Sequence, residues 1–239
     1  MPHNTCIIAC ETLKDELNAV MRKLNSTLPV VWLDSGAHAQ PEKLREKVQA
    51  AIDSLPDNYT TVLLLFGFCG NTMVGIKSEK RTLVLPVTAD CIPLFLGSCE
   101  KREACGTDTY FFTKGYFDSP GSIVSETQRV MEHYGAEEGL AIMKEILKSY
   151  CSFTVIDTGA FNSIDLLNKV KGYAKLFDIP VKMIRGSLRL IELLVSGDWL
   201  PEDFLIKKPG ETITLEDALC AGKTHQALTQ ITASPIIGN

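Results

Sequence analysis

The chain has 239 residues, of which 45% are hydrophobic and 22% charged, and a formal net charge of −5. This size and composition are typical of a globular protein with one sizeable α/β core or two small domains. The scattered basic residues exclude the basic patch of a nucleic-acid-binding protein, and no apolar run approaches the roughly 20 residues of a membrane span. The N-terminal segment lacks the basic and long apolar regions of a secretory signal, so we expect a cytoplasmic protein that acts on neither nucleic acid nor membrane.

Strand and helix patterns alternate along the first hundred residues. Apolar runs predict strands at 5–10, 28–34, 61–66 and 81–87, and helical spacing of apolar residues predicts helices at 11–24, 41–55 and 91–98. The strands are almost continuously apolar, which is typical of a parallel sheet covered by helices on both faces. We therefore expect the carboxyl ends of these strands to share one edge of a sheet.

The alternation continues after a charged segment at 97–108, which we interpret as a long exposed loop. Strands are predicted at 109–115, 152–157 and 179–184, helices at 121–134, 136–149, 161–177 and 186–196, and a terminal strand pair turning at Pro209-Gly210. The fold class predicted is α/β, a Rossmann-like open and mostly parallel sheet with helices on both faces. We expect one α/β domain over 1–239, with a candidate subdomain boundary near 99–108.

Four residues of metal-binding type follow the first four predicted strands. Cys10 ends the first strand, His38 lies in the loop after the second, Cys69 follows the third and Cys91 follows the fourth. The carboxyl ends of strands in open α/β sheets are where ligands bind, so these side chains are expected to meet. Cys10 and Cys91 also begin predicted helices, whose dipole favours thiolate over thiol.

Two metal chemistries fit this set of residues. Three thiolates and one imidazole suit zinc, either closed or with one open position, and three thiolates suit an iron–sulfur cluster. Because the four residues are scattered and no C-x-x-C pair is present, spacing does not choose between them. Packing is the plainer alternative for each cysteine, since cysteine is a common apolar filler.

Neighbouring residues supply further candidates for the same site. Gly70 and Asn71 in "GFCGN" and Asp90 before Cys91 are predicted to contact a cofactor, although turn formation and helix capping would also account for them. Glu11 is a candidate general base and Thr113 a candidate substrate contact. Glycine at Gly67 and Gly70 would allow backbone to approach closely.

Several blocks of this sequence resemble, in order, the domain-of-unknown-function family 1638. The blocks are "ACETLKDEL", "GAHAQPEKLREKVQAAID", "GFCGN", "ADCIPLFLGS", "YFFTKGYFD" and "DFLIKKPGETI", which span nearly the whole chain. The resemblance implies family positions at Cys10, His38, Cys69-Gly70 and Asp90-Cys91, and an aromatic–Thr–x–Gly segment at Phe112, Thr113 and Gly115. It also implies a family of methanogenic archaea and anaerobic bacteria, often found beside corrinoid-dependent methyltransferase systems.

Three functional hypotheses follow. The first is a metal-binding enzyme holding zinc or an iron–sulfur cluster through Cys10, Cys69, Cys91 and His38, and acting on a small molecule in methyl or one-carbon metabolism. The second is a metal-free enzyme with two cysteines as acid and base, as in cofactor-independent racemases. The third is an accessory protein or metal carrier that binds a corrinoid protein, which an exposed apolar patch would favour.

Overall fold

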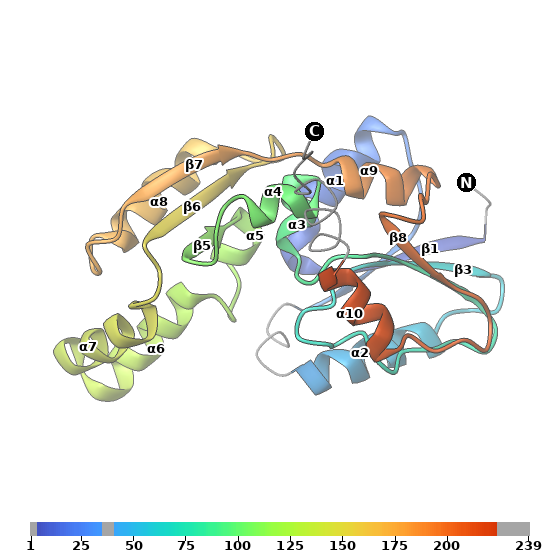
Figure 1. The fold of residues 1–239 in the computed structure, drawn as a ribbon, viewed down its shortest axis with the longest axis horizontal. Coiled ribbons are helices and arrows are strands. Elements are labelled where there is room, and N and C mark those ends of the chain that lie inside the picture. The colour runs from blue at the N-terminus through green and yellow to red at the C-terminus, as the bar shows by residue number, and fades with distance from the viewer. Residues whose placement is uncertain (1–3, 35–40, 224–239) are drawn as a thin grey trace, which may run out of the picture.

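The computed structural model describes residues 4–34 and 41–223, with the side chains of the last helix described as far as Leu219 (Figure 1). Two separate sheets make up the β structure of these residues. One has five strands in the order β2-β1-β3-β4-β8, and the other has three in the order β5-β6-β7. The predicted α/β class with mostly parallel strands is confirmed, and the strands are divided between two sheets rather than placed in one.

The bounds of the strands follow the apolar runs of the sequence closely. They are β1 (Thr5–Cys10), β2 (Val30–Leu33), β3 (Thr61–Leu65), β4 (Thr82–Pro86), β5 (Thr109–Phe112), β6 (Ser152–Asp157), β7 (Val181–Arg185) and β8 (Phe204–Lys207). The helices are α1 (Lys14–Lys23), α2 (Pro41–Asp53), α3 (Ile92–Leu96), α4 (Cys99–Glu103), α5 (Lys114–Phe117), α6 (Ile123–Tyr134), α7 (Ala136–Leu147), α8 (Ser163–Ala174), α9 (Arg189–Ser196) and α10 (Leu215–Lys223), with a 3-10 turn η1 (Glu11–Leu13) before α1.

The order of the first sheet contains a reversal. From β1 the chain moves to β2 on one side and then returns to β3 on the other, with all three strands parallel. Such a reversal opens a crevice outside the carboxyl ends of the two central strands, because their following loops diverge. Ala9 pairs with Leu65 near this edge, so Cys10 and the loop after β3 leave the sheet side by side.

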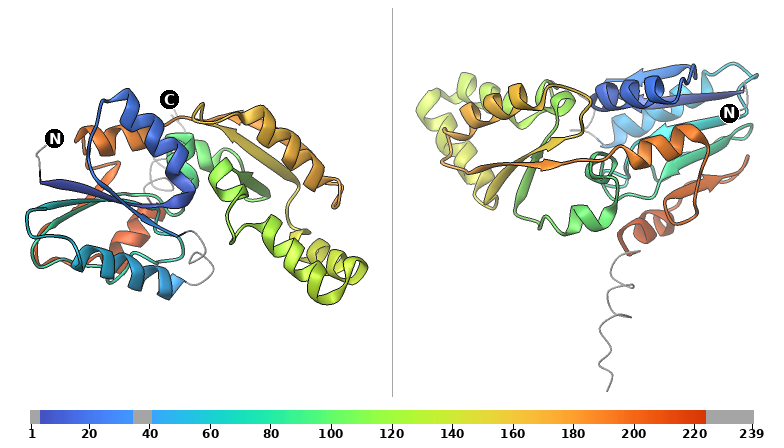
Figure 2. Two further views of the ribbon diagram at one scale, coloured as in Figure 1. Left: turned by 180° about the vertical axis from the view of Figure 1, so that it is seen from behind. Right: turned by 90° about the horizontal axis from the view of Figure 1, so that it is seen from above.

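Helices cover both faces of the first sheet. Figure 1 and Figure 2 show α1 and α9 on one face and α2 on the opposite face. Each strand residue of β1 is buried, which accounts for its unbroken apolar run. In the second sheet α8 packs against β6 and β7, and Phe112, Phe153 and Tyr173 lie in a separate aromatic cluster.

Three sequence-based assignments are wrong in detail. The segment 97–108 contains the helix α4, with Ser98 accepting a hydrogen bond from the Lys101 amide at its N-terminus. The strand predicted at 109–115 ends at Phe112, where Thr113 caps the short helix α5. The terminal strand pair does not form, since β8 instead pairs antiparallel with β4. None of the helices in the described residues is long and apolar enough to cross a membrane.

Candidate functional site

Two cysteines meet where β3 and β4 end. The Sγ atoms of Cys69 and Cys91 lie 3.2 Å apart, and the amide of Gly67 points at Cys91 Sγ from 3.4 Å. The loops that carry them are joined by backbone hydrogen bonds, from the Phe68 amide to the Thr88 carbonyl and from the Cys69 amide to the Ala89 carbonyl, each 2.9 Å. The contact between the sulfurs is therefore built into the pairing of the two loops.

Gly67 allows these loops to approach. A Cβ at this position would lie 2.4 Å from the carbonyl carbon and oxygen of Asp90, and 2.9 Å from the amide nitrogen of Cys91. The close approach that Gly67 allows is thus one between the two loops. Glycine is needed at Gly70 for a different reason. A Cβ there would meet no atom within 4 Å, but the φ of 71° lies in the left-handed region that favours glycine.

The turn at 69–71 is conformationally costly. Cys69 and Asn71 take positive φ angles of 43° and 67° on either side of Gly70. A residue other than glycine in the left-handed region costs on the order of 1 kcal/mol or more, and such residues cluster at functional sites. The turn places the Cys69 side chain inward while Gly70 and Asn71 stay exposed.

Cys10 is the third sulfur at this edge of the sheet. Its side chain is buried, and the Thr12 hydroxyl donates a hydrogen bond to Cys10 Sγ at 3.1 Å. Burial and, to a smaller extent, the charge of Cys91 together raise the pKa of Cys10 to about 12, against the lowering effect of the Thr12 hydrogen bond. The two cysteines are therefore coupled electrostatically as well as close in the topology.

Cys10 and Cys91 favour the protonated thiol, because the pKa of each is raised, contrary to the expectation from helix dipoles. Sharing a contact with Cys69 raises the pKa of Cys91 well above the ordinary thiol value, and burial adds to the effect. Cys10 begins only the three-residue turn η1, and Cys91 only the five-residue helix α3. The contact with Cys69 and burial at Cys91, and burial at Cys10, outweigh the dipoles of such short helices.

A pocket of about 310 Å³ opens beside the cysteine pair. Its walls come from the loops after β3 and β4, from α3 and α4, and from the start of the second sheet. It is lined by Thr12, Cys69, Asp90, Cys91, Ile92, Phe95, Arg102, Thr107, Thr109, Tyr110, Phe111, Thr113, Tyr116 and Tyr150. The pocket therefore lies between the two sheets, and both cysteine thiols and the hydroxyl groups of threonines and tyrosines line it.

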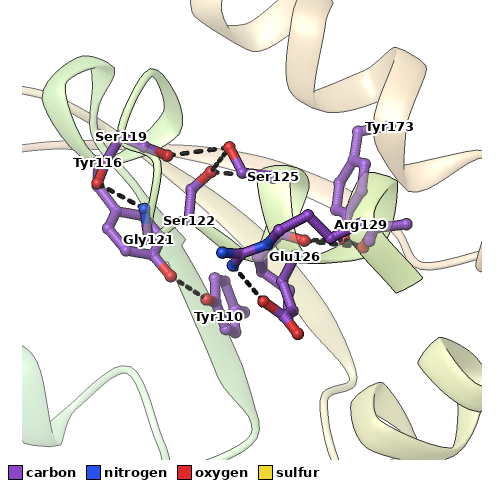
Figure 3. A network of polar contacts seen from close by, with 11 residues as sticks. Tyr110, Tyr116, Ser119, Gly121, Ser122, Ser125, Glu126, Arg129 and Tyr173 are labelled. Atoms are coloured by element: carbon purple, nitrogen blue, oxygen red, sulfur yellow. Dashed lines mark hydrogen bonds and ion pairs between the residues drawn. The ribbon is translucent and has the colours of Figure 1, made fainter. Parts of the chain in front are cut away.

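Two of the tyrosines that line the pocket form a hydrogen bond with each other. The phenol oxygens of Tyr110 and Tyr116 lie 2.5 Å apart, and burial raises the pKa of Tyr110 above the ordinary range (Figure 3). Behind this pair a turn of serines begins α6, where the Gly121 amide donates to Ser119 Oγ at 3.1 Å (Figure 3). The turn is joined to the tyrosine pair, because the Ser119 amide donates a hydrogen bond to the Tyr116 carbonyl at 3.0 Å.

Of the remaining residues predicted for the site, some line the pocket and some do not. Thr113 and Asp90 line it, and Asp90 Oδ1 also accepts a hydrogen bond from the Ile92 amide at 2.8 Å, so it caps α3 as well. Glu11, Gly70 and Asn71 are exposed and are not among its lining residues. His38 lies outside the described residues.

The described side chains do not by themselves complete a metal centre. Within residues 4–34 and 41–219, no group of three or more His, Cys, Asp or Glu side chains is arranged to hold a metal ion. Cys69 and Cys91 form a close pair of thiols, and Cys10 ends the neighbouring strand β1.

Sequence reasoning missed the pocket residues of α4 and the second sheet. Arg102 was assigned to an exposed loop, and Tyr110 to an ordinary strand position. Tyr150 precedes β6 without any motif. Their participation depends on how the two sheets meet, which no spacing in the sequence encodes.

The fold and site define an open α/β protein with a thiol pair at a pocket between two sheets. The chain belongs to the family described as "Protein of unknown function (DUF1638)", whose model matches residues 32–195. The predicted family is confirmed over a shorter range than the resemblance implied. This range includes His38, Cys69 and Cys91 and begins after Cys10. Neither a curated protein nor a solved structure matches the chain.

Proposed function

We propose that this protein is a metal-dependent enzyme in which Cys69 and Cys91 bind zinc at the mouth of the pocket, and a small-molecule substrate occupies the pocket itself. The observation that carries the proposal is the 3.2 Å contact between the two Sγ atoms beside a pocket of about 310 Å³. Cys10 and His38 are the further ligands proposed, the latter lying outside the described residues.

The separation of the sulfurs supports a shared metal. With Zn–S bonds of about 2.3 Å and tetrahedral angles, two thiolates on one zinc stand about 3.8 Å apart. The Cys69–Cys91 pair needs to open by only about half an ångström to reach that spacing. The raised thiol pKa of Cys91 adds to the argument, because a divalent cation would displace its proton and relieve the unfavourable contact.

The pocket favours an enzyme over a metal carrier. A carrier must release its metal to a partner and has no need of an adjoining chamber, whereas catalysis needs room for a substrate beside the metal. Zinc bound here would hold a thiol or other acceptor group of the substrate as its anion. Thr113 and the Tyr110–Tyr116 pair would then orient the rest of the molecule through their hydroxyl groups.

The contact between the sulfurs weighs against an acid–base pair made of these two cysteines. In a two-base racemase, acid and base act on opposite faces of the substrate carbon. Sulfurs 3.2 Å apart leave no space for a carbon between them. An iron–sulfur cluster stays the alternative metal, and methyl or one-carbon metabolism with a corrinoid partner stays a prediction from the family resemblance.

The test is the metal content of protein purified without oxygen. We expect close to one zinc per chain by elemental analysis, and cobalt substitution should give a thiolate-to-cobalt charge-transfer absorption. Cys69→Ala and Cys91→Ala should each lower the bound metal by more than tenfold. Cys151→Ala is the matched control, since Cys151 is exposed and does not line the pocket, and it should keep full metal.

Each outcome bears on the proposal. A visible absorption of the untreated protein with iron and sulfide in the analysis would replace zinc by a cluster. Protein without stoichiometric metal, or a Cys69→Ala variant with wild-type metal content, would sink the proposal.

A further inference from the structure

Arg102 is the cation among the residues that line the pocket. It lies on α4, and its guanidinium carbon stands 4.9 Å from the centre of the Phe111 ring. Nη1 donates a hydrogen bond to the Gly106 carbonyl at 3.0 Å, and Nε lies 3.5 Å from Asp90 Oδ2. These three contacts fix the plane of the guanidinium group at one side of the pocket.

Several N–H groups of the Arg102 guanidinium make no hydrogen bond with the described residues. A guanidinium carries five N–H donors in a planar fork. Nε is buried against Asp90, 3.5 Å from its Oδ2, and makes no hydrogen bond with the described residues. The donors that a ligand in the pocket can reach are therefore those of the two Nη atoms, of which Nη1 also donates to the Gly106 carbonyl. The Arg102 side chain is 26% exposed, so the fork still has access to a ligand in the pocket.

The pocket carries little net charge of its own. Asp90 offsets Arg102, and Asp90 Oδ1 is already occupied by the Ile92 amide. The remaining polar groups are mainly the hydroxyls of threonine and tyrosine, which can donate hydrogen bonds to an anion. One guanidinium with a neighbouring carboxylate suits a singly charged anion better than a phosphate dianion, which would meet repulsion from Asp90.

We propose that the pocket binds a small carboxylic acid, with its carboxylate on Arg102 and its reactive end toward Cys69 and Cys91. This inference rests on the proposed function in that it names the substrate class of the same pocket. A planar carboxylate matches the fork of arginine in a bidentate arrangement, which a lysine or a threonine cannot supply. The thiols line the same chamber, so a molecule held there presents its other end to sulfur.

A pair of alkylating reagents tests this directly. Iodoacetate and iodoacetamide both transfer a two-carbon group to thiolate sulfur with loss of iodide, and they differ in charge. The full-length chain is treated with a chelator and checked for metal, so that its thiols are free whether or not it bound metal. The rate of each reagent at Cys69 and Cys91 is then measured by peptide mass spectrometry.

The readout is the ratio of the iodoacetate rate to the iodoacetamide rate. Because both reagents attack the same thiolate, the ratio cancels the fraction of thiol that is ionised. We expect the ratio at the faster pocket cysteine to exceed that of N-acetylcysteine in solution by on the order of tenfold. Cys151 is not a neutral reference, because its thiol lies beside Asp108.

Two variants and a control separate the charge of Arg102 from general effects. Arg102→Gln should bring the ratio down to that of N-acetylcysteine, and Asp90→Asn should raise it, since asparagine can keep the cap on Ile92 while losing the charge. Arg129→Gln is the matched control, because Arg129 pairs with Glu126 on the surface of α6 (Figure 3). It should leave the ratio unchanged.

A wild-type ratio equal to that of N-acetylcysteine, or an Arg102→Gln ratio equal to that of wild type, would overturn the carboxylate site. Arg102→Gln that fails to fold leaves Asp90→Asn as the deciding variant, and an unchanged ratio there would also overturn it. Neither result depends on metal content, so failure of this inference and failure of the zinc proposal are distinguishable.

Discussion

At the scale of single residues, the position of the cysteines could be predicted and their chemistry could not. Cys69 and Cys91 follow apolar runs that end at one sheet edge, and the sequence alone indicates that much. The raised pKa of Cys91 depends on a 3.2 Å contact between sulfur atoms 22 residues apart in sequence and on burial. No local pattern reports that contact, so the expectation of thiolates from helix dipoles was wrong.

The close backbone approach at Gly67 leads to a prediction for a single substitution. Gly67→Ala would place a Cβ 2.4 Å from the backbone of Asp90, which has no freedom to rotate away, so we expect a loss of about 1–3 kcal/mol in the free energy of unfolding. Urea denaturation measures it.

Gly172→Ala is the control for this change. Gly172 lies within α8 with nothing inside 4 Å of its missing Cβ, so alanine there should stabilise the protein by about 0.5–1 kcal/mol through helix propensity. Equal effects of the two substitutions would contradict the role given to Gly67.

At the scale of elements, apolar periodicity predicts most helices and strands to within a few residues. The exceptions are short elements set by capping and by sheet contacts. Helix α4 carries a charged surface and no buried residue, so its sequence looks like a loop until Ser98 caps it. Strand β8 pairs with β4 across more than a hundred residues of chain, and hairpin rules applied to Pro209-Gly210 predict the wrong partner.

Helix α1 contains a buried carboxyl group, which the apolar periodicity of the sequence does not predict. Glu16 is fully buried, accepts a hydrogen bond from Thr158 Oγ1 at 3.1 Å, and leaves Oε2 without a partner among the described residues. Burial is the main cause that raises the pKa of Glu16 from 4.5 to about 7, a value that already includes the lowering effect of the Thr158 hydrogen bond and the smaller effects of Asp15 and Lys114.

The stability of the protein is therefore expected to fall as pH rises from about 4.5 to about 7. In this range the folded state keeps the proton that the unfolded state has lost, and the difference amounts to about 3 kcal/mol by pH 7. Glu16→Gln should remove this decline, as measured by urea denaturation at about pH 5 and about pH 8.

Glu11→Gln is the matched control, because Glu11 is an exposed carboxyl on the preceding turn. It should preserve the pH dependence of the wild type. A Glu16→Gln variant with the same decline as wild type would show that Glu16 is not responsible.

At the scale of the whole molecule, the site belongs to the junction of the two sheets. The loops after β3 and β4 supply sulfur, α4 supplies Arg102, and the tyrosines come from β5, from α5 and from the residues just before β6. The sequence predicts the two sets of strands but carries no signal for how they meet, so it indicates the thiol edge and Thr113 but not Arg102, Tyr110 or Tyr150.

The junction depends on a second close backbone approach. Gly115 on α5 faces the carbonyl of Thr12, and a Cβ there would lie 2.1 Å from that oxygen. We expect Gly115→Ala to separate the sheets locally, costing about 1–3 kcal/mol in the free energy of unfolding and increasing the alkylation rates of Cys69 and Cys91 by iodoacetamide. Unchanged stability and unchanged alkylation rates would show that the junction tolerates the extra atom.

The pairing of β8 with β4 has a consequence for the order in which the protein assembles. A chain emerging from the ribosome delivers β4 by residue 86 but its antiparallel neighbour only at 204–207, after all three strands of the second sheet. Until then the edge of β4 offers unpaired backbone groups to any extended segment nearby. The second sheet can thus form before β8 has been added to the first sheet. A chain that ends before Phe204 would contain a complete second sheet and a first sheet whose exposed edge strand β4 promotes aggregation.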